Sequence, residues 1–171
     1  MLKVVGACLI VGVCAYAGFL AALGLKKRAA LLAVLGQGFL ALKREITYSA
    51  APLQEALQTA ANAAGVGGAL FALTAQGLAS GVGLSAQMAW QDALERCPLR
   101  ERLKPADVEI LAAFGEGLGL ADAEEQEKRI ELCRLRLASA EEAAMALANQ
   151  MGKVWRNLGW ALGLLLTLLF L

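Results

Sequence analysis

The sequence predicts an all-α protein, a compact six-helix bundle flanked by an N-terminal and a C-terminal transmembrane helix. Three observations support this fold class. No stretch alternates apolar and polar residues as a half-buried strand does. Apolar residues in the middle of the chain recur at helical spacing instead. Both ends carry runs without a charged side chain, Val4–Leu25 and Asn157–Leu171.

The two apolar runs are the expected membrane spans. The first has about 22 residues, roughly 33 Å as a helix, enough to cross a hydrocarbon core of ~30 Å. The second has only about 15 residues and is short by the same measure, so Trp155 and Trp160 are expected to anchor it in the interface. The chain is 58% hydrophobic with a mean hydropathy of +0.57, as expected for a membrane protein. We therefore expect one span in residues 1–26, the bundle in 27–154, and a second span in 155–171.

Charged residues beside the runs predict the orientation. Basic side chains adjoin the runs on the bundle side: Lys26, Lys27, Arg28, Lys153 and Arg156. Only Lys3 and the terminal amine lie on the other side. By the positive-inside rule, the bundle is expected in the cytoplasm, on a multi-pass anchor in the cell membrane.

A cleaved signal peptide is the alternative. Lys3, the apolar stretch and Ala15–Ala17 fit that pattern and would leave Gly18 as the first residue, while a lipobox-like segment would leave a lipid-modified Cys8. Either would make the bundle an exported or lipid-anchored structural domain acting between membranes. Against cleavage, the apolar run continues to Leu25 and meets a basic stop. A holin-like pore would need polar faces in the spans, which the sequence lacks.

Six helices are expected between the runs. They are Lys27–Tyr48, Pro52–Ala64, Val66–Ala79, a helix from Ser85 that ends before Pro98, one from Pro105 to the Gly115–Gly119 break, and one from Asp122 into the second run. The first carries an apolar stripe: Leu32, Leu35, Phe39, Leu42 and Ile46. Ser85 is placed as an N-cap, and Asp122 with Glu125 makes a capping-box-like start. Trp90 and Phe114 are expected in the core.

The composition argues against catalysis. His is absent, which removes the commonest acid/base catalyst and metal ligand. The four Cys are scattered without a CxxC pair, and no nucleophile–base arrangement is visible. The net charge of +1 gives no indication of nucleic acid. Gly81–Ala86 matches G-x-G-x-x-A without a preceding strand, so a helix–helix turn is expected. We expect no enzyme activity, cofactor, metal or small-molecule substrate.

Three segments resemble one family. They are LKREITYSAAPLQEAL (Leu42–Leu57), LAAFGEGLGLADAEEQEKRIEL (Leu111–Leu132) and KVWRNLGWALGLLLTLLFL (Lys153–Leu171). Together they resemble the stage III sporulation protein AB family over the whole chain. Ala51 departs from the family pattern, which usually has Thr before the proline.

The resemblance implies a function beyond what the residues themselves indicate. That family acts in the mother-cell membrane facing the forespore, as part of a transenvelope channel, or feeding tube, formed with other stage III A proteins and protein Q. Its bundle resembles the cytoplasmic domain of the type II secretion platform protein F. By that analogy the partner is the secretion-type ATPase, stage III sporulation protein AA.

The candidate partner-binding residues lie in two of these segments. They are Glu45, Tyr48 and Glu55 around Pro52, and Asp122, Glu124 and Gln126 in the acidic stretch. A structural interpretation stays open for both groups, with Tyr48 packed inside the chain and the acids on a solvated face. Gly159 and Gly163 form G-x-x-x-G, and Gly18 belongs to a small-residue strip in the first run; these could pack the spans or form a homo-oligomer.

Overall fold

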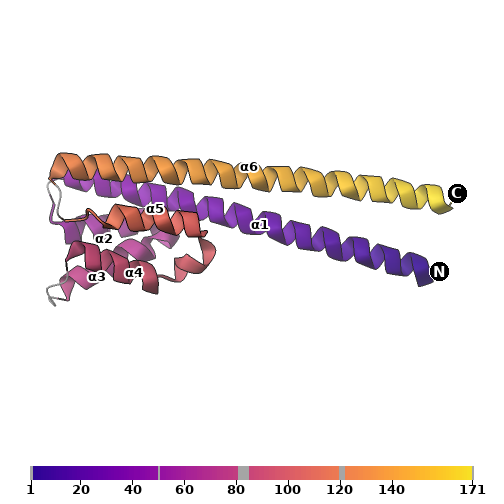
Figure 1. The fold of residues 1–171 in the computed structure, drawn as a ribbon, viewed down its shortest axis with the longest axis horizontal. Coiled ribbons are helices and arrows are strands. Elements are labelled where there is room, and N and C mark those ends of the chain that lie inside the picture. The colour runs from indigo at the N-terminus through magenta and orange to yellow at the C-terminus, as the bar shows by residue number, and fades with distance from the viewer. Residues whose placement is uncertain (1, 50, 81–84, 120–121, 171) are drawn as a thin grey trace. The chain divides into compact units, whose positions relative to one another are not determined.

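The computed structural model describes residues 2–49, 51–80, 85–119 and 122–170 (Figure 1). Side chains are described at Tyr16, Leu20 and from Leu23 to Val154, outside those gaps and Ala123. The chain divides into two compact units. Unit 1 contains Met1–Ala29 and Glu142–Leu171, and unit 2 contains Ala30–Glu141. Each unit is described by itself.

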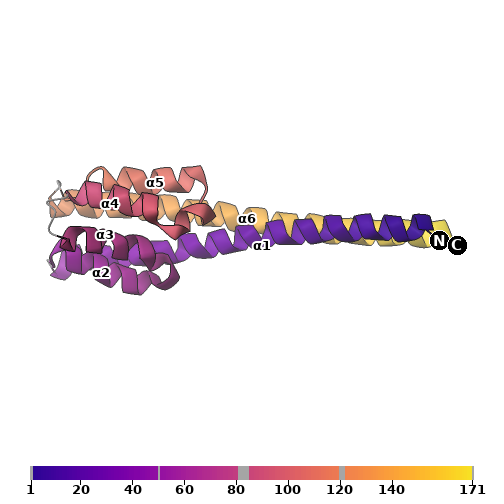
Figure 2. The ribbon, with the colours of Figure 1, turned by 90° about the horizontal axis from the view of Figure 1, so that it is seen from below.

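The described residues are helical in every regular element and contain no strand, which confirms the all-α class. The α-helices are α1 (Leu2–Arg44), α2 (Leu53–Ala64), α3 (Ala69–Ala79), α4 (Ala86–Arg96), α5 (Pro105–Gly115) and α6 (Ala123–Phe170). A π-helix, η1 (Glu45–Ser49), follows α1, and two 3₁₀ turns, η2 (Gly65–Gly68) and η3 (Pro98–Arg102), lie between α-helices. Figure 2 shows the same elements from a second direction.

Local signals explain most of the boundaries. Ser85 caps α4, because its Oγ accepts a hydrogen bond from the backbone N–H of Met88 at 3.2 Å. Helix α2 begins one residue after Pro52 and ends where Gly65 adopts φ +52°, a conformation that L side chains rarely take. The helix expected from Val66 starts later, at Ala69, since the glycine-rich segment before it forms a 3₁₀ turn.

Each of the two longest helices includes one of the apolar runs. Helix α1 continues without a break through Lys26–Arg28, so the first apolar run and the first expected bundle helix lie in a single helix. Helix α6 likewise continues past Gly152 to Phe170, as the sequence indicated. The start of α1 and the end of α6 make up unit 1. Side chains of both apolar runs lie largely outside the described part, so membrane spanning stays a prediction.

Among the residues that could be searched for a membrane span, one segment is long and apolar enough. It is Leu53–Ala79, with a mean hydropathy of 1.2 and half of the window buried in the protein. This segment comprises α2, η2 and α3, which contribute Leu57, Leu70 and Phe71 to the hydrophobic core. We interpret it as core because a buried helix of a bundle passes the same test.

Four aromatic rings form the centre of the bundle. Phe39 of α1 lies 5.1 Å from Phe71, 6.1 Å from Trp90 and 4.9 Å from Phe114, measured between ring centroids. The Trp90 indole N–H donates a hydrogen bond to the Leu111 carbonyl at 2.8 Å, so its polar atom is satisfied inside the core. The predicted stripe on α1 is buried at Leu32, Leu35, Phe39 and Leu42. Trp90 and Phe114 are confirmed as core residues.

The bundle of unit 2 has two distinct ends. We call the end at which α1 ends (Arg44) and α6 begins (Ala123) the far end, and the opposite end the near end. The near end carries η2 and η3, which lie at the same end of the bundle in Figures 1 and 2. A Cβ added at Gly67 of η2 would meet Val34 and Leu35 of α1, and Leu99 of η3 lines a pocket with Leu35.

Candidate partner-binding surface

The far end brings together all six predicted partner-binding residues. Glu45 and Tyr48 lie in η1, and Glu55 lies in the first turn of α2, which packs against η1. Asp122, Glu124 and Gln126 lie at the start of α6. Residues separated by most of the bundle sequence therefore share one surface, which the sequence alone did not establish.

The start of α6 is built around Asp122. Its Oδ1 accepts a hydrogen bond from the Glu125 N–H at 2.8 Å, and its carbonyl accepts one from the Gln126 N–H at 2.9 Å. Asp122 therefore caps the helix, as expected from the sequence. Two i,i+4 ion pairs follow on the same helix, Glu124–Lys128 at 2.7 Å and Glu125–Arg129 at 3.0 Å.

A second ion-pair network, which the sequence analysis missed, connects α1 to α6. The Lys43 Nζ lies 3.2 Å from Glu127 and 3.3 Å from Glu131, and the Thr47 hydroxyl donates to Glu127 at 3.3 Å. Arg134 donates to Glu131 at 2.6 Å. Hydrogen bonds to Glu127 and Glu131 raise the pKa of Lys43, and those from Arg134 and then Lys43 lower the pKa of Glu131. Both groups are therefore charged near neutral pH.

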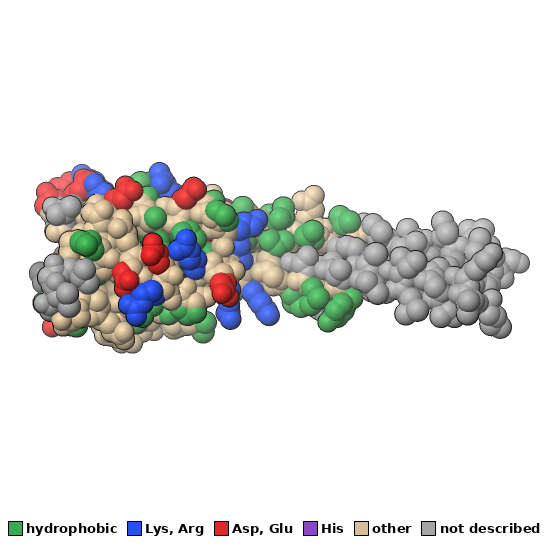
Figure 3. Space-filling model, turned by 60° about the horizontal axis from the view of Figure 1, so that its bottom comes forward, with side chains coloured by type: hydrophobic (Ala, Val, Ile, Leu, Met, Phe, Trp, Pro, Cys, Tyr) green, Lys and Arg blue, Asp and Glu red, His purple; other side chains and the backbone are tan. Residues whose placement is uncertain are grey.

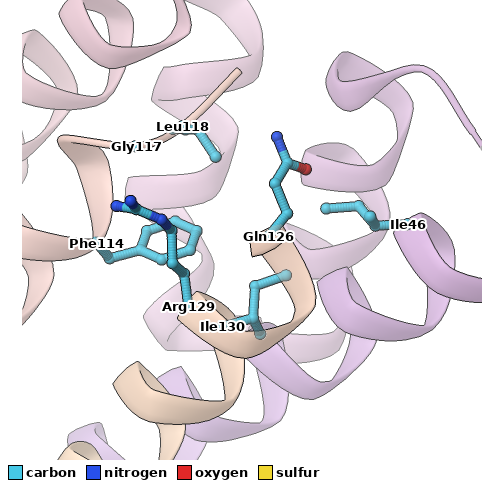
Figure 4. Close-up of a pocket in the computed structure, with 7 residues that line it drawn as sticks. All are labelled: Ile46, Phe114, Gly117, Leu118, Gln126, Arg129 and Ile130. Carbon is cyan, nitrogen blue, oxygen red and sulfur yellow. The ribbon is translucent and has the colours of Figure 1, made fainter. Parts of the chain in front are cut away.

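A narrow apolar crevice separates η1 from the start of α6 (Figure 4). Its lining residues are Ile46, Phe114, Gly117, Leu118, Gln126, Arg129 and Ile130. The Arg129 guanidinium lies so close to Gly117 that a Cβ there would overlap it. Figure 4 shows Gln126 between Ile46 and Arg129 at the rim of the crevice. Its side chain is half-buried, so only part of this predicted partner-binding residue can contact a partner.

The far end carries more acidic than basic side chains, and three of its acids form no ion pair with the other described residues. Residues 43–55 and 116–129 carry seven carboxylates and four basic side chains. Glu45, Glu55 and Glu116 make no ion pair within the described part of the chain. Figure 3 shows one group of acidic side chains at the upper left of the bundle and others spread along it. Such a surface attracts a basic partner and repels an acidic one.

Tyr48 corrects one interpretation from the sequence. Its packing inside the chain was one expectation, but 84% of its surface is exposed. Tyrosine is enriched at protein interfaces because one rigid side chain supplies both apolar area and a hydroxyl group. The structure thus leaves this ring available to a partner.

The predicted anchors and span-packing residues lie outside the residues whose side chains are described. These are Trp155, Trp160, Gly18, Gly159 and Gly163. Within the described residues, no group of three His, Cys, Asp or Glu side chains could hold a metal ion. Cys97 and Cys133 are both buried, and burial raises the pKa of Cys133 to about 12. Their thiols are therefore protonated and poorly reactive at neutral pH.

A family model described as stage III sporulation protein AB matches residues 3–171. The chain belongs to the stage III sporulation protein AB family. It is 33% identical over 172 residues to stage III sporulation protein AB of Bacillus subtilis (strain 168), and all of both chains is covered. A solved structure of stage III sporulation protein AB matches with a TM-score of 0.61 and 30% identity, covering 70% of this chain and 94% of that one. The sequence-based family assignment is confirmed, and membership in the AB family implies a role in sporulation.

Proposed function

We propose that this AB-family chain is a non-enzymatic platform of the transenvelope channel between mother cell and forespore. Its apolar ends anchor it in the mother-cell membrane facing the forespore, with the bundle in the cytoplasm. The bundle binds the ATPase, stage III sporulation protein AA, through the far end. Other stage III A proteins and protein Q are the expected neighbours in the membrane.

The acidic, exposed far end carries this proposal. It gathers Glu45, Tyr48 and Glu55 from one part of the chain and the start of α6 from another. The far end lies at the end of α1. About 30 Å of helical rise along α1 separates Leu25, the last residue of the first apolar run, from Arg44 at this end.

Binding of the purified ATPase to the full chain in detergent tests the proposal. The variant Glu45→Lys, Glu55→Lys, Glu124→Lys reverses three exposed or half-exposed charges and leaves the capping residue Asp122 intact. The matched control, Glu95→Lys, Glu101→Lys, Glu109→Lys, makes the same charge change at exposed positions elsewhere in the bundle. We expect the first variant to weaken binding about tenfold or more, because each reversed charge adds repulsion at the contact.

Equal binding by both variants and the wild type would contradict docking at the far end. The topology is tested separately with a reactive cysteine at exposed Gln54 in a chain that carries Cys8→Ala and Cys14→Ala, because the remaining Cys97 and Cys133 are buried. Labelling of Gln54→Cys from outside intact cells would contradict the cytoplasmic assignment and favour the exported alternative.

A further inference from the structure

The near end of the bundle differs in chemistry from the far end. The η3 loop presents Arg100, Arg102 and Lys104 to solvent, against a single exposed acid, Glu101. None of the three cations makes an ion pair within the described residues. Three exposed and unpaired cations on one short loop form a surface that attracts anions.

The loop that carries these cations is firmly held. Leu99 and Cys97 are buried, and both line a pocket with Leu35 of α1 and Leu70 of α3. Asp107 of α5 accepts a hydrogen bond from the Lys104 N–H at 2.9 Å, which fixes the end of the loop. The basic side chains therefore project from an ordered support rather than from a loose segment.

The neighbouring turn, η2, adds an apolar tip. The sequence from Ala56 to Gln91 contains no charged residue, and within it Val66 is 76% exposed. An isolated exposed valine is ordinary on a protein surface. Here it lies at the same end of the bundle as the cations, next to Gly67, which packs on Val34 and Leu35 of α1. Cations beside an apolar tip match the chemistry of an anionic membrane surface.

The position of this end along the chain favours a lipid ligand over an acidic protein. Leu35, which contacts both turns, follows Arg28 by two turns of α1, about 10 Å of rise. Arg28 ends the basic stop that follows the apolar run. Electrostatic attraction to a charged surface extends about 8–10 Å at physiological ionic strength, and arginine and lysine side chains add several ångströms of reach. Along the chain, the near end is thus the part of the bundle that follows the basic stop most closely, which favours headgroups as its ligand.

We propose that the near end is a membrane-contact surface, in which Arg100, Arg102 and Lys104 bind anionic phospholipid headgroups while Val66 enters the interface. This inference rests on the membrane anchoring proposed above and adds a second, lipid-dependent contact that fixes the bundle against the bilayer. The acidic far end is then kept away from the like-charged surface and turned toward its partner.

The test uses the full chain in lipid nanodiscs, with Cys8→Ala and Cys14→Ala to remove the cysteines of the apolar run. An environment-sensitive fluorophore is attached at Val66→Cys, and in a matched control at Gln54→Cys, which is exposed at the start of α2, on the far end. The discs contain phosphatidylcholine alone or with phosphatidylglycerol, and a lipid-borne quencher reports contact. We expect quenching at position 66 to rise with phosphatidylglycerol and to fall in high salt, with no change at position 54.

Neutralising the loop identifies the groups responsible. Each cation near an anionic surface contributes about fivefold, so Arg100→Gln, Arg102→Gln, Lys104→Gln should lower the docked-to-undocked ratio by up to about 100-fold. The control variant Arg44→Gln, Lys128→Gln, Arg136→Gln removes as many exposed cations elsewhere and should retain the lipid response. Unchanged Trp90 emission, read in variants that also carry Trp155→Phe and Trp160→Phe, verifies that the core is intact.

The outcomes separate this inference from the proposed function. A chain that enters nanodiscs but shows equal, weak quenching at positions 66 and 54 in both lipid mixtures overturns the lipid contact and leaves the anchoring intact. An acidic protein would then be the better candidate ligand for the loop. A chain that fails to enter nanodiscs overturns the anchoring and this inference together.

Discussion

Replacing Phe39 with alanine tests whether the four-ring cluster is the centre of stability. Phe39 is fully buried and contacts Phe71, Trp90 and Phe114 through their rings. Truncation of a buried phenylalanine to alanine costs about 3–5 kcal/mol. That cost already includes ring contacts, each worth about 0.5–1.5 kcal/mol beyond the buried area, so three of them place Phe39 at the upper end of the range. We therefore expect a loss of about 4–5 kcal/mol in the free energy of unfolding.

That loss is large compared with the stability of a domain of this size. Single domains unfold with about 5–15 kcal/mol, and for a unit of about 110 residues the loss corresponds to a fall in Tm of about 15 °C or more. Emission from Trp90 reports the transition once Trp155→Phe and Trp160→Phe remove the other tryptophans. Tyr48→Ala is the control, because it removes a similar ring from an exposed site and should change the stability by less than about 0.5 kcal/mol. A Phe39→Ala loss below about 1 kcal/mol would refute the packing described for the core.

Four single sites carry further predictions. Gly36→Ala should raise the free energy of unfolding by about 0.5–1 kcal/mol, since a Cβ there meets nothing within 4 Å. Gly115→Ala should lower it, because its Cβ would overlap Trp90, and paired thermal melts check both substitutions. Because the pKa of Glu131 is lowered, its contribution to folding stability should be complete above the ordinary pKa of 4.5 and be lost as the pH falls below that value. The stability difference between the wild type and Glu131→Gln should therefore shrink in acid. A difference that grows in acid would contradict this prediction. Cys133 should react with maleimide at neutral pH only after denaturant is added, and rapid labelling of the folded protein would contradict its burial.

Local signals in the sequence predicted the helix caps and the buried helix face better than they predicted the interactions between surface residues. Ser85 and Asp122 act as caps within three residues of the groups they satisfy, so their roles depend on adjacent sequence alone. The stripe that contains Phe39 likewise predicts a buried face, because its spacing follows the helical repeat. These features are short-range, and the structure contains them nearly as expected.

The features that the sequence did not predict depend on distant residues. Lys43 pairs with Glu131, 88 positions away, and Thr47 with Glu127, 80 positions away. The π-helix that follows α1 lies beside this network, and a π-turn holds one more residue than an α-turn, which rotates the side chains after it. Tyr48 follows Ile46 of the stripe by two positions, about 200° around an α-helix, so helical spacing alone also turns it away from the buried face. Neither pairing has a signature in the residues next to it.

The pairing of α1 with α6 also determines when the bundle can finish folding. The first half of the chain supplies Phe39 and Leu42, but Ile130 and Leu137, which complete the same core, are synthesised near the end. A nascent chain released before α6 therefore exposes an apolar face that no earlier helix covers, and such surfaces favour aggregation and degradation. Premature termination anywhere before Ala123 thus yields a product that cellular proteases can remove before it occupies a place among its partners.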